Sequence, residues 1–565
     1  MHLTTRTTLC AGVALLMACA SSSPLNALES RADTFNNPVI WQDYPDLDVF
    51  RVGDVFYYSS STFAFSPGAP VLKSYDLVNW APVSHSVPRL NFGSAYDLNS
   101  ATSRAYVKGI WASTLRYRAS TDTFYWIGCI SGGPSYVWTA SGTKAGANNG
   151  EVDNWNWTSR GTLPRCYYDN GLLIDDDDTM YIAYGSTTIN VAQLNADGTA
   201  EVKNQAVYKS PDGVYIEGSR MYKINGTYYI FVTKPAGTFA NLNITMHPAD
   251  KYHPDDEYVL KSKNVWGPYE RQIVVDSIAG PLPNAGNAHQ GGIVSTKDGK
   301  WYYMAFLDSY PGGRIPVLAP LTFTKDGWPQ VVRVNNEWGK SYPMPVQTKK
   351  TVPSSLGMDS FTGPKLSPEW EWNHNPDESS YSFNGGLRLR AATVTNDLFT
   401  ARNTLTRRIP GPKSAGTFRI DISKLKDGDR AGAVLFRDVA AYIGIHKSGD
   451  SSSLVMVDKL NLGTNWVTNS TGTVAATGPR LAANAKEVWL RIESDITPAF
   501  SNTQAVRTTT FWYSLDGTSF TQLGKPFPMS NTWQFFTGYR FGVFNFATKA
   551  LGGEVTVKSF DLKML

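Results

Sequence analysis

A unit of turn followed by aromatic strand recurs five times along this 565-residue chain and constrains its fold more than any other feature. The central tyrosines of successive units lie 68, 56, 48 and 73 residues apart, a spacing typical of propeller blades with variable loops. The units end in GDVFYY (53–58), TDTFYW (121–126), DDDTMYI (176–182), NGTYYI (225–230) and DGKWYY (298–303). We therefore expect residues 33–350 to form a five-bladed β-propeller, in which four-stranded sheets surround a central channel.

One position in each unit lies 11 to 13 residues before the central tyrosine. The residues found there are Asp46, Ser113, Asp169, Glu217 and His289. A fixed offset before a fixed turn predicts the same point on the same strand of each blade, close to the propeller axis. Three of these five residues are carboxylic acids, so the sequence predicts a cluster of acids in the channel.

The sequence pattern changes after a polar linker at residues 347–358. From residue 359 to 565, short strands alternate with turns and the aromatic repeat is absent. About 200 residues of this kind predict a β-sandwich of jelly-roll, concanavalin-like type. We therefore expect an all-β protein, with a propeller at residues 33–350 and a sandwich at residues 359–565.

The first 20 residues have the features of an export signal. Arg6 precedes an apolar core (9–20), which ends in the small-residue cleavage site Ala18-Cys19-Ala20. LMAC at 16–19 also loosely fits a bacterial lipoprotein site. We expect a secreted, extracellular protein. The net charge of +4 without a basic run favours neither nucleic acid nor a membrane surface as partner, and no apolar stretch reaches membrane-spanning length.

Two cysteines, Cys129 and Cys166, remain after the signal, and they fit either one disulfide or two buried thiols. Four Asn-x-Thr sequons are glycosylation sites if the host is eukaryotic: Asn156, Asn225, Asn243 and Asn469. The polar, unpatterned segment 237–254 interrupts a blade and fits either a surface insertion or a retained intron.

Three stretches around the acids resemble signature segments of glycoside hydrolase family 43, in particular its two-domain fungal arabinofuranosidases and xylosidases. They read NNPVIWQDYPDLDVFRVGD (36–54), YYDNGLLIDDDDTMYIAYG (167–185) and YIEGSRMYKINGTYYI (215–230). HQGGIV (289–294) and GGRIPV (312–317) also resemble family segments. In the second domain, WEWNHNPD (370–377) and DGDRAGAVLFRD (427–438) resemble the sandwich appended to many members.

The resemblance implies inverting hydrolysis of a glycosidic bond. By position in the motifs, Asp46 matches the general base and Glu217 the general acid. Asp169 matches a third acid that orients Glu217 and raises its pKa. An inverting enzyme separates its acid and base by roughly 6.5–9.5 Å so that a water fits between them. Acids on facing blades of a narrow propeller can meet that spacing.

The resemblance also implies roles for three further residues. Trp111 would form an aromatic wall beside the sugar, and Arg314 matches a substrate-contacting arginine. His289 would lie on the axis below the acids, near substrate, and would hold an ion such as calcium through water. No organic cofactor is expected.

Four functions fit the sequence to different degrees. The first is an α-L-arabinofuranosidase that removes arabinose from arabinoxylan of the plant cell wall, including doubly substituted xylose. The second is an exo-acting β-xylosidase, because STFAFSPGAP (61–70) resembles a xylosidase segment. A fructan hydrolase would need a different motif at Asp46 and a cysteine after Glu217. A non-catalytic carbohydrate-binding propeller would have no use for three acids.

Overall fold

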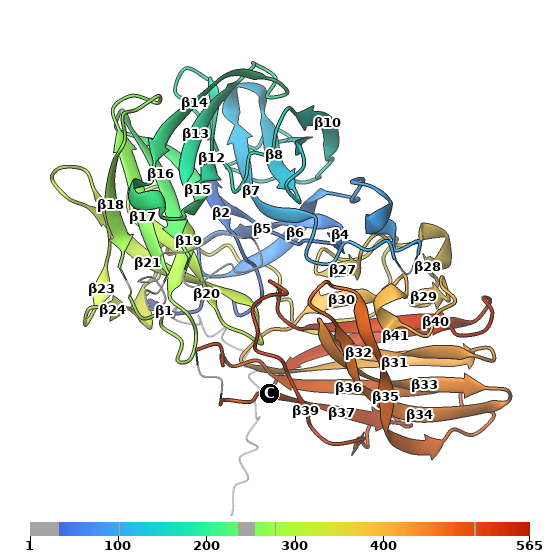
Figure 1. Ribbon diagram of the computed structural model, residues 1–565. Coiled ribbons are helices and arrows are strands. Elements are labelled where there is room, and N and C mark those ends of the chain that lie inside the picture. The colour runs from blue at the N-terminus through green and yellow to red at the C-terminus, as the bar shows by residue number, and fades with distance from the viewer. Residues whose placement is uncertain (1–32, 101, 236–254, 277, 502–503) are drawn as a thin grey trace, which may run out of the picture.

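The computed structural model is all-β, with a five-bladed propeller followed by a β-sandwich, which confirms the predicted fold class (Figure 1). It describes all residues except 1–32, 101, 236–254, 277 and 502–503. The predicted signal peptide and the segment 237–254 lie outside the described residues. None of the described helices is long and apolar enough to cross a membrane. The helices are short 3-10 turns: η1 (Ser94–Asp97), η2 (Ala119–Thr121), η3 (Pro211–Gly213), η6 (Glu378–Ser380) and η7 (Leu398–Thr400).

Each blade is a four-stranded antiparallel sheet built from consecutive strands. The first blade contains β2 (Asp48–Val52), β3 (Val55–Ser59), β5 (Gly68–Ser74) and β6 (Trp80–Val87). The second contains β7 (Ile110–Arg118), β8 (Thr123–Ile130), β9 (Ser135–Ser141) and β10 (Thr158–Leu163). The third contains β11 (Gly171–Ile174), β12 (Met180–Ser186), β13 (Thr188–Leu194) and β14 (Glu201–Lys209).

The fourth blade contains β15 (Glu217–Ile224), β16 (Thr227–Lys234), β17 (Asp256–Ser262) and β18 (Glu270–Val275). The fifth contains β19 (Ala288–Ser295), β20 (Trp301–Asp308), β21 (Arg314–Phe323) and β22 (Pro329–Val331). The first strands of the blades contact one another in a closed ring, in the order β2, β7, β11, β15, β19 and back to β2. This ring brings residues near the start of each blade to the propeller axis.

The turn residues of the repeat explain why the blades form. The turn between the first and second strand of a blade needs left-handed backbone, which glycine, asparagine and aspartate adopt most easily. Gly53, Asp122, Asp178, Asn225 and Gly299 all have positive φ at these turns. The run of aspartates before Met180 is accordingly a hairpin turn, in which the amide of Asp178 donates to the carbonyl of Asp175.

Two further links hold the propeller together. β1 (Thr34–Asn36) pairs with β25 (Ser341–Pro343), so the two ends of the propeller segment are joined. Cys129 and Cys166 form a disulfide between the second blade and the loop that enters the third. A small hairpin, β23 (Arg333–Val334) with β24 (Glu337–Trp338), lies just before β25.

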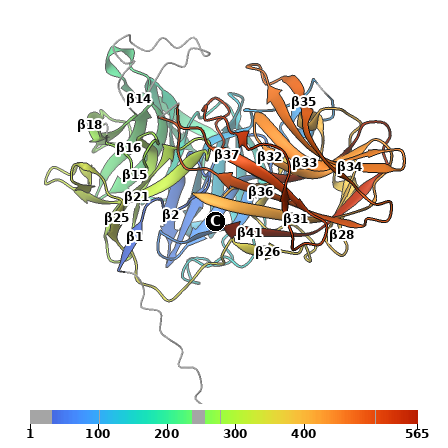
Figure 2. The ribbon, with the colours of Figure 1, turned by 90° about the horizontal axis from the view of Figure 1, so that it is seen from below.

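The sandwich packs two large antiparallel sheets around a core that includes Trp370, Phe418 and Phe560 (Figure 2). One sheet contains β26 (Gly357–Asp359), β28 (Tyr381–Phe383), β29 (Leu387–Arg390), β31 (Lys413–Lys424), β36 (Glu487–Asp495), β37 (Thr508–Ser514), β38 (Thr521–Gln522), β39 (Phe527–Pro528) and β41 (Glu554–Met564). The other contains β27 (Trp370–Asn373), β30 (Leu405–Arg408), β32 (Asp429–Phe436), β33 (Val439–Ser448), β34 (Ser451–Leu462), β35 (Thr468–Arg480) and β40 (Arg540–Ala547).

The second sheet continues across the domain boundary. Its last strand, β4 (Phe65–Ser66), belongs to the propeller segment and pairs with β27 of the sandwich (Figure 1). Backbone pairing of this kind fixes the two domains against each other more firmly than side-chain contacts along a flexible linker would. The sandwich therefore has a defined position against the first blade.

A buried charge cluster reinforces this junction. The carboxylate of Glu371 in β27 accepts from Arg408 at 2.8 Å and from Arg540 at 2.6 Å. His85 of the first blade lies 3.1 Å from the same carboxylate. Burial alone would raise the pKa of Glu371, but the two guanidinium groups hold it below its usual range. Removing one member of such a cluster leaves an uncompensated buried charge.

Candidate active site

The backbone at the mouth of the channel is held in an unusual conformation at three places. Asp46, Asp169 and Gln290 have φ of 55°, 49° and 49°, in the left-handed region that side-chain-bearing residues rarely adopt. Such residues cluster at functional sites, because the surrounding structure must compensate for the strain. All three side chains are buried. They come from the first, third and fifth blades, and so surround the axis.

Glu217 begins β15, directly before an irregularity in the pairing of that strand with β16. Its Oε2 accepts hydrogen bonds from the hydroxyl of Tyr168 at 2.7 Å and from that of Tyr215 at 3.0 Å. Burial raises the pKa of Glu217; the two phenols oppose that rise, and the charge of Asp46 adds to it. A carboxyl group with a raised pKa is suited to donate a proton.

Asp169 lies shortly before β11 of the third blade and contacts the fourth and fifth blades. Its carboxylate accepts from Gln290 Nε2 at 3.3 Å and from the backbone amide of Gly218. Burial raises the pKa of Asp169 well above its usual value, and the charges of Glu217 and Asp46 raise it further. The charges of the three acids therefore lie close enough together to interact.

Gly218 has a structural reason to be glycine. Its φ is +74°, and a Cβ there would approach Cγ of Gln290 to 2.7 Å. The contact between Gln290 and Asp169 depends on this close approach of the backbone.

Asp46 is held on both sides of its carboxylate. Oδ1 accepts from Arg314 Nη1 at 2.5 Å, and Oδ2 accepts from the hydroxyl of Ser61. Its backbone carbonyl accepts from Arg220 Nη2 at 2.9 Å, while the same guanidinium donates to the carbonyl of Asn170 at 2.6 Å. Arg220 thus connects the segments that carry Asp46 and Asp169.

Arg314 is surrounded by aromatic rings from both domains. Its guanidinium lies 5.1 Å from the ring of Phe306, 5.9 Å from that of Phe63 and 5.7 Å from that of Phe536. Phe536 belongs to the sandwich, and its carbonyl accepts from Arg314 Nε at 3.2 Å. The second domain therefore contributes directly to the wall of the site.

Asp43 stabilises the contact between Arg314 and the sandwich. One carboxylate oxygen accepts from the amide of Arg314 at 2.8 Å, and the other accepts from the amide of Gly538 in the sandwich at 2.9 Å. Because one buried carboxylate binds both domains beside the acids, a shift of the sandwich would disturb Arg314.

Trp111 lies at the rim of the same site. Its half-buried ring stands edge-on to that of Tyr168, with centroids 6.2 Å apart. Its indole nitrogen donates to the carbonyl of Val107 at 3.1 Å, which fixes the ring plane. Trp111 is therefore adjacent to the tyrosine that donates to Glu217.

His289 faces a separate group of acids. Its Nδ1 lies 3.6 Å from Asp255 and 3.0 Å from the carbonyl of Asn287. Asp255, His289 and Asp308 offer ligand atoms that all lie within 4.8 Å of one another. Burial raises the pKa of Asp308 to about 6 and that of nearby Glu257 to about 8. The carboxylate oxygens of Asp255 and Asp308 are ligands of the kind that calcium prefers, so this group fits such a cation.

The alignment of units by a fixed offset is wrong at one position. The strand irregularity lies between Ile110 and Ser113 in β7, whereas in β15 it follows Glu217 and in β19 it follows His289. Ser113 therefore lies after the irregularity of its strand, whereas Glu217 and His289 lie before theirs. Ser113 lies within its own blade, where its hydroxyl accepts from Trp126 at 3.0 Å.

Several site residues are absent from the predictions made on sequence. Tyr168 and Tyr215 adjoin the acids in the chain, and this proximity could have indicated them. Gln290 follows His289, but only its left-handed backbone turns it towards Asp169. No sequence pattern near Phe536 indicated a role in the site, because this residue belongs to the other domain and meets the site only in the folded protein.

Comparison with known proteins agrees with this geometry. Residues 35–329 match the model of glycosyl hydrolases family 43, and residues 358–563 match that of the beta-xylosidase C-terminal concanavalin A-like domain. The chain belongs to glycosyl hydrolases family 43.

Named relatives fall into two activities. A beta-xylosidase of Formosa agariphila is 30% identical over 93% of this chain and 90% of its own length. The non-reducing end alpha-L-arabinofuranosidase BoGH43B of Bacteroides ovatus is 28% identical over 72% of this chain and 74% of its own. Most of the curated relatives are bacterial, so the likeness to fungal members stays a prediction.

One solved structure is much more similar. It is a GH43 glycoside hydrolase whose engineered active site displays both endo-xylanase and exo-arabinofuranosidase activity. That chain is 59% identical to this one, with a TM-score of 0.89, over 94% of this chain and all of the other.

Proposed function

We propose that this protein is an inverting, exo-acting α-L-arabinofuranosidase that releases arabinose from the side chains of arabinoxylan, including doubly substituted xylose. The observation that carries the proposal is the 59% identity with a solved enzyme described as having exo-arabinofuranosidase activity. The geometry of the acids supports hydrolysis, and the family itself acts on glycosidic bonds. The finer choice of sugar rests on that likeness.

In the proposed reaction, Glu217 donates its proton to the glycosidic oxygen as the bond to the anomeric carbon breaks. Asp46 removes a proton from a water that attacks the same carbon from the opposite face. The products are free arabinose and the xylan hydroxyl, and the enzyme returns to its starting state by proton exchange with solvent. Asp169 acts as the third acid, because two neighbouring buried carboxyl groups resist ionising together and the Asp169–Glu217 pair therefore retains a proton.

Arg314 has a double role in this proposal. Its ion pair with Asp46 fixes the direction from which the base can reach water. Its remaining N–H groups are placed to contact sugar hydroxyls within the walls formed by Phe63, Phe306 and Phe536. Trp111 would complete the opposite side of the pocket.

A second candidate is an exo-acting β-xylosidase. The names of several curated relatives favour it, including the one from Formosa agariphila. Arabinofuranose and xylopyranose present similar hydroxyl groups, so the same acids serve either substrate.

Identification of the released sugar tests the two functions. The protein is incubated with arabinoxylan and, separately, with unsubstituted xylo-oligosaccharides, and the products are separated by chromatography. Arabinose from the first substrate, with no xylose from the second, supports the proposal. Xylose released from the ends of xylo-oligosaccharides would favour the alternative.

We also propose that Asp255, His289 and Asp308 hold a structural cation, such as calcium, below the acids. The carboxylates of Asp255 and Asp308 and a ring nitrogen of His289 would be its ligands, because these atoms all lie within 4.8 Å of one another. Removal of the ion with EDTA should lower the melting temperature, and added calcium should restore it. An unchanged melting temperature after dialysis, with no calcium found by elemental analysis, would reject the site.

Export and glycosylation remain proposals as well. The signal-like residues 1–20 and the disulfide between Cys129 and Cys166 support an oxidising, extracellular location. N-terminal sequencing of the protein recovered from culture medium would test removal of the signal, and mass spectrometry would show which of the sequons carry a glycan.

A further inference from the structure

A pocket opens on the face of the propeller opposite to the acids. β15 begins at Glu217 and ends at Ile224, a distance of roughly 23 Å for an extended strand of this length. The pocket begins at that far end, between the fourth and fifth blades, and has a volume of about 510 Å³. It therefore shares no residue with the active site.

Three aromatic rings line one side of this pocket. Phe323 stands edge-on to Trp301, with centroids 5.8 Å apart, and to Tyr229 at 6.1 Å. Trp301 and Phe323 are only partly buried. Partly exposed rings gathered in a concave site provide an apolar surface of the kind on which the faces of pyranose sugars stack.

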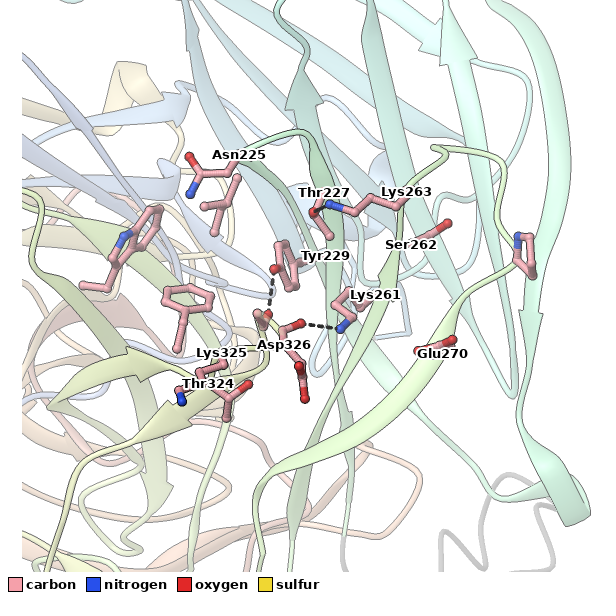
Figure 3. Close-up of a pocket in the computed structure, with 15 residues that line it drawn as sticks. Asn225, Thr227, Tyr229, Lys261, Ser262, Lys263, Glu270, Thr324, Lys325 and Asp326 are labelled. Atoms are coloured by element: carbon pink, nitrogen blue, oxygen red, sulfur yellow. Dashed lines mark hydrogen bonds between the residues drawn. The ribbon is translucent and has the colours of Figure 1, made fainter.

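The loop between β21 and β22 of the fifth blade, which closes the pocket, is held by side chains of the fourth blade (Figure 3). The hydroxyl of Tyr229 donates to the carbonyl of Gly327 at 2.7 Å, and Lys261 Nζ donates to the carbonyl of Asp326 at 2.8 Å. The ammonium of Lys261 also lies 3.8 Å from the centre of the Trp328 ring. The pocket is thus preformed, which lowers the entropic cost of binding a ligand.

The charged groups that line the pocket are of both signs: three lysines, Lys261, Lys263 and Lys325, and two carboxylates. Lys261 is engaged as described, and Lys263 donates to the hydroxyl of Thr227 at 2.6 Å. The carboxylates of Glu270 and Asp326, both exposed, share the lining with these lysines (Figure 3). Mixed charge with exposed amide and carboxylate groups suits the hydroxyl groups of a neutral sugar.

Asn225 supplies the most accessible polar group. It lies in the turn between β15 and β16, with φ of 50°, and its side chain is exposed at the edge of the pocket (Figure 3). An amide can donate to one sugar hydroxyl and accept from another, next to a ring that receives the sugar face.

From these features we infer a second carbohydrate-binding site, which takes a short run of neutral pyranose units from a polysaccharide main chain. The inference goes beyond the proposed function, because it concerns binding of the polymer and involves none of the acids. A polymer held at this face would keep the enzyme on its substrate between cleavage events.

Affinity electrophoresis tests the site without turnover. A Glu217→Gln protein, made in a bacterial host so that Asn225 carries no glycan, is run in gels with increasing concentrations of soluble neutral arabinoxylan. Adding Trp301→Ala should weaken retardation about tenfold in apparent affinity, since the stacking surface is lost. Asn225→Gly, which keeps the left-handed turn, should weaken it by a smaller factor.

The matched control is Trp512→Ala, which removes a partly exposed tryptophan on β37 of the sandwich, far from the pocket. Its retardation should equal that of the parent. In proteins that keep Glu217, turnover of a soluble aryl glycoside should be the same with and without Trp301→Ala, which separates this site from the catalytic one.

Unchanged retardation of the Trp301→Ala and Asn225→Gly proteins would overturn the inference. If Trp301→Ala lowers the melting temperature, its weaker retardation could reflect damage to the fold. The Asn225→Gly protein then decides whether the site exists, because Asn225 is exposed. Failure of the proposed function would show differently, as absence of arabinose release with polymer binding intact.

Discussion

The ring of Phe536 in the sandwich stacks on the ring of Phe63 in the propeller, with centroids 5.5 Å apart and planes 19° from parallel. Both rings lie within 6 Å of the Arg314 guanidinium, which binds Asp46. The catalytic pocket is therefore a product of two domains, although the first domain carries all three acids.

Phe536→Ala should lower kcat/KM by about tenfold, because the stacked wall beside Arg314 is lost while the acids stay in place. Steady-state kinetics on an aryl glycoside and on an oligosaccharide would measure the effect. The matched control is Phe520→Ala, which removes a half-buried ring that packs on Arg491 elsewhere in the sandwich. Equal losses in the two variants would indicate general damage to the domain.

Truncation after Gln347 should give a poorly soluble protein with a lower melting temperature. The cut removes the partner of β4, the ring that covers Phe63 and the carboxylate that His85 faces. Expression yield, scanning calorimetry and polymer hydrolysis measure the consequence. A truncated protein with the full-length melting temperature and polymer activity would contradict rigid docking of the domains.

Substitution of either main acid should abolish turnover, with losses of about 10²–10⁴-fold for Asp46→Ala and for Glu217→Ala. Asp46→Asn is a useful companion, because asparagine tolerates the left-handed backbone that strains alanine. An aryl glycoside with a good leaving group should partly rescue Glu217→Ala, since that leaving group needs little protonation. It should not rescue Asp46→Ala, and activity like the wild type in either variant would reverse the assignment of roles.

Tyr168→Phe should move the alkaline limb of the pH–activity profile to higher pH. The Tyr168 hydroxyl stabilises the ionised form of Glu217, so its loss raises the pKa of that carboxyl. A general acid works while it is protonated, and a higher pKa extends activity upwards in pH. Tyr167→Phe is the control, because the hydroxyl of Tyr167 donates to Glu201 and not to Glu217. A downward shift in the Tyr168 variant would argue against Glu217 as the acid.

The first sugar released should have inverted anomeric configuration. Proton NMR recorded before mutarotation would show it, since a single displacement by water delivers the hydroxyl to the face opposite the departing group. Initial retention would require a covalent intermediate and would exclude the mechanism proposed for Asp46.

The blades and the acids could be predicted because their signals are local. A turn residue such as Asn225 and the tyrosine four residues later define one hairpin, and repetition of that hairpin defines the propeller. The three acids follow from their fixed distance to the same hairpins. Ser113 was misaligned because a strand irregularity moves the register by one residue, and no sequence pattern marks its place.

The remaining parts of the site could not be read from the chain because they depend on long-range geometry. Phe536 meets Phe63 only after both domains have folded and docked. Gln290 turns towards Asp169 through a backbone conformation that its residue type does not require. The two-residue strand β4 is too short to have any periodicity, yet it connects the domains.

The sheet shared by β4 and β27 also affects how such proteins can be recombined. A chimera joined in the linker, near residue 350, would separate Phe65 and Ser66 from the strand that evolved beside them. A sandwich transplanted from another member would meet a foreign edge strand and a foreign partner for Phe536. Successful exchange of the second domain should therefore require the β4 segment of the first to be transferred with it.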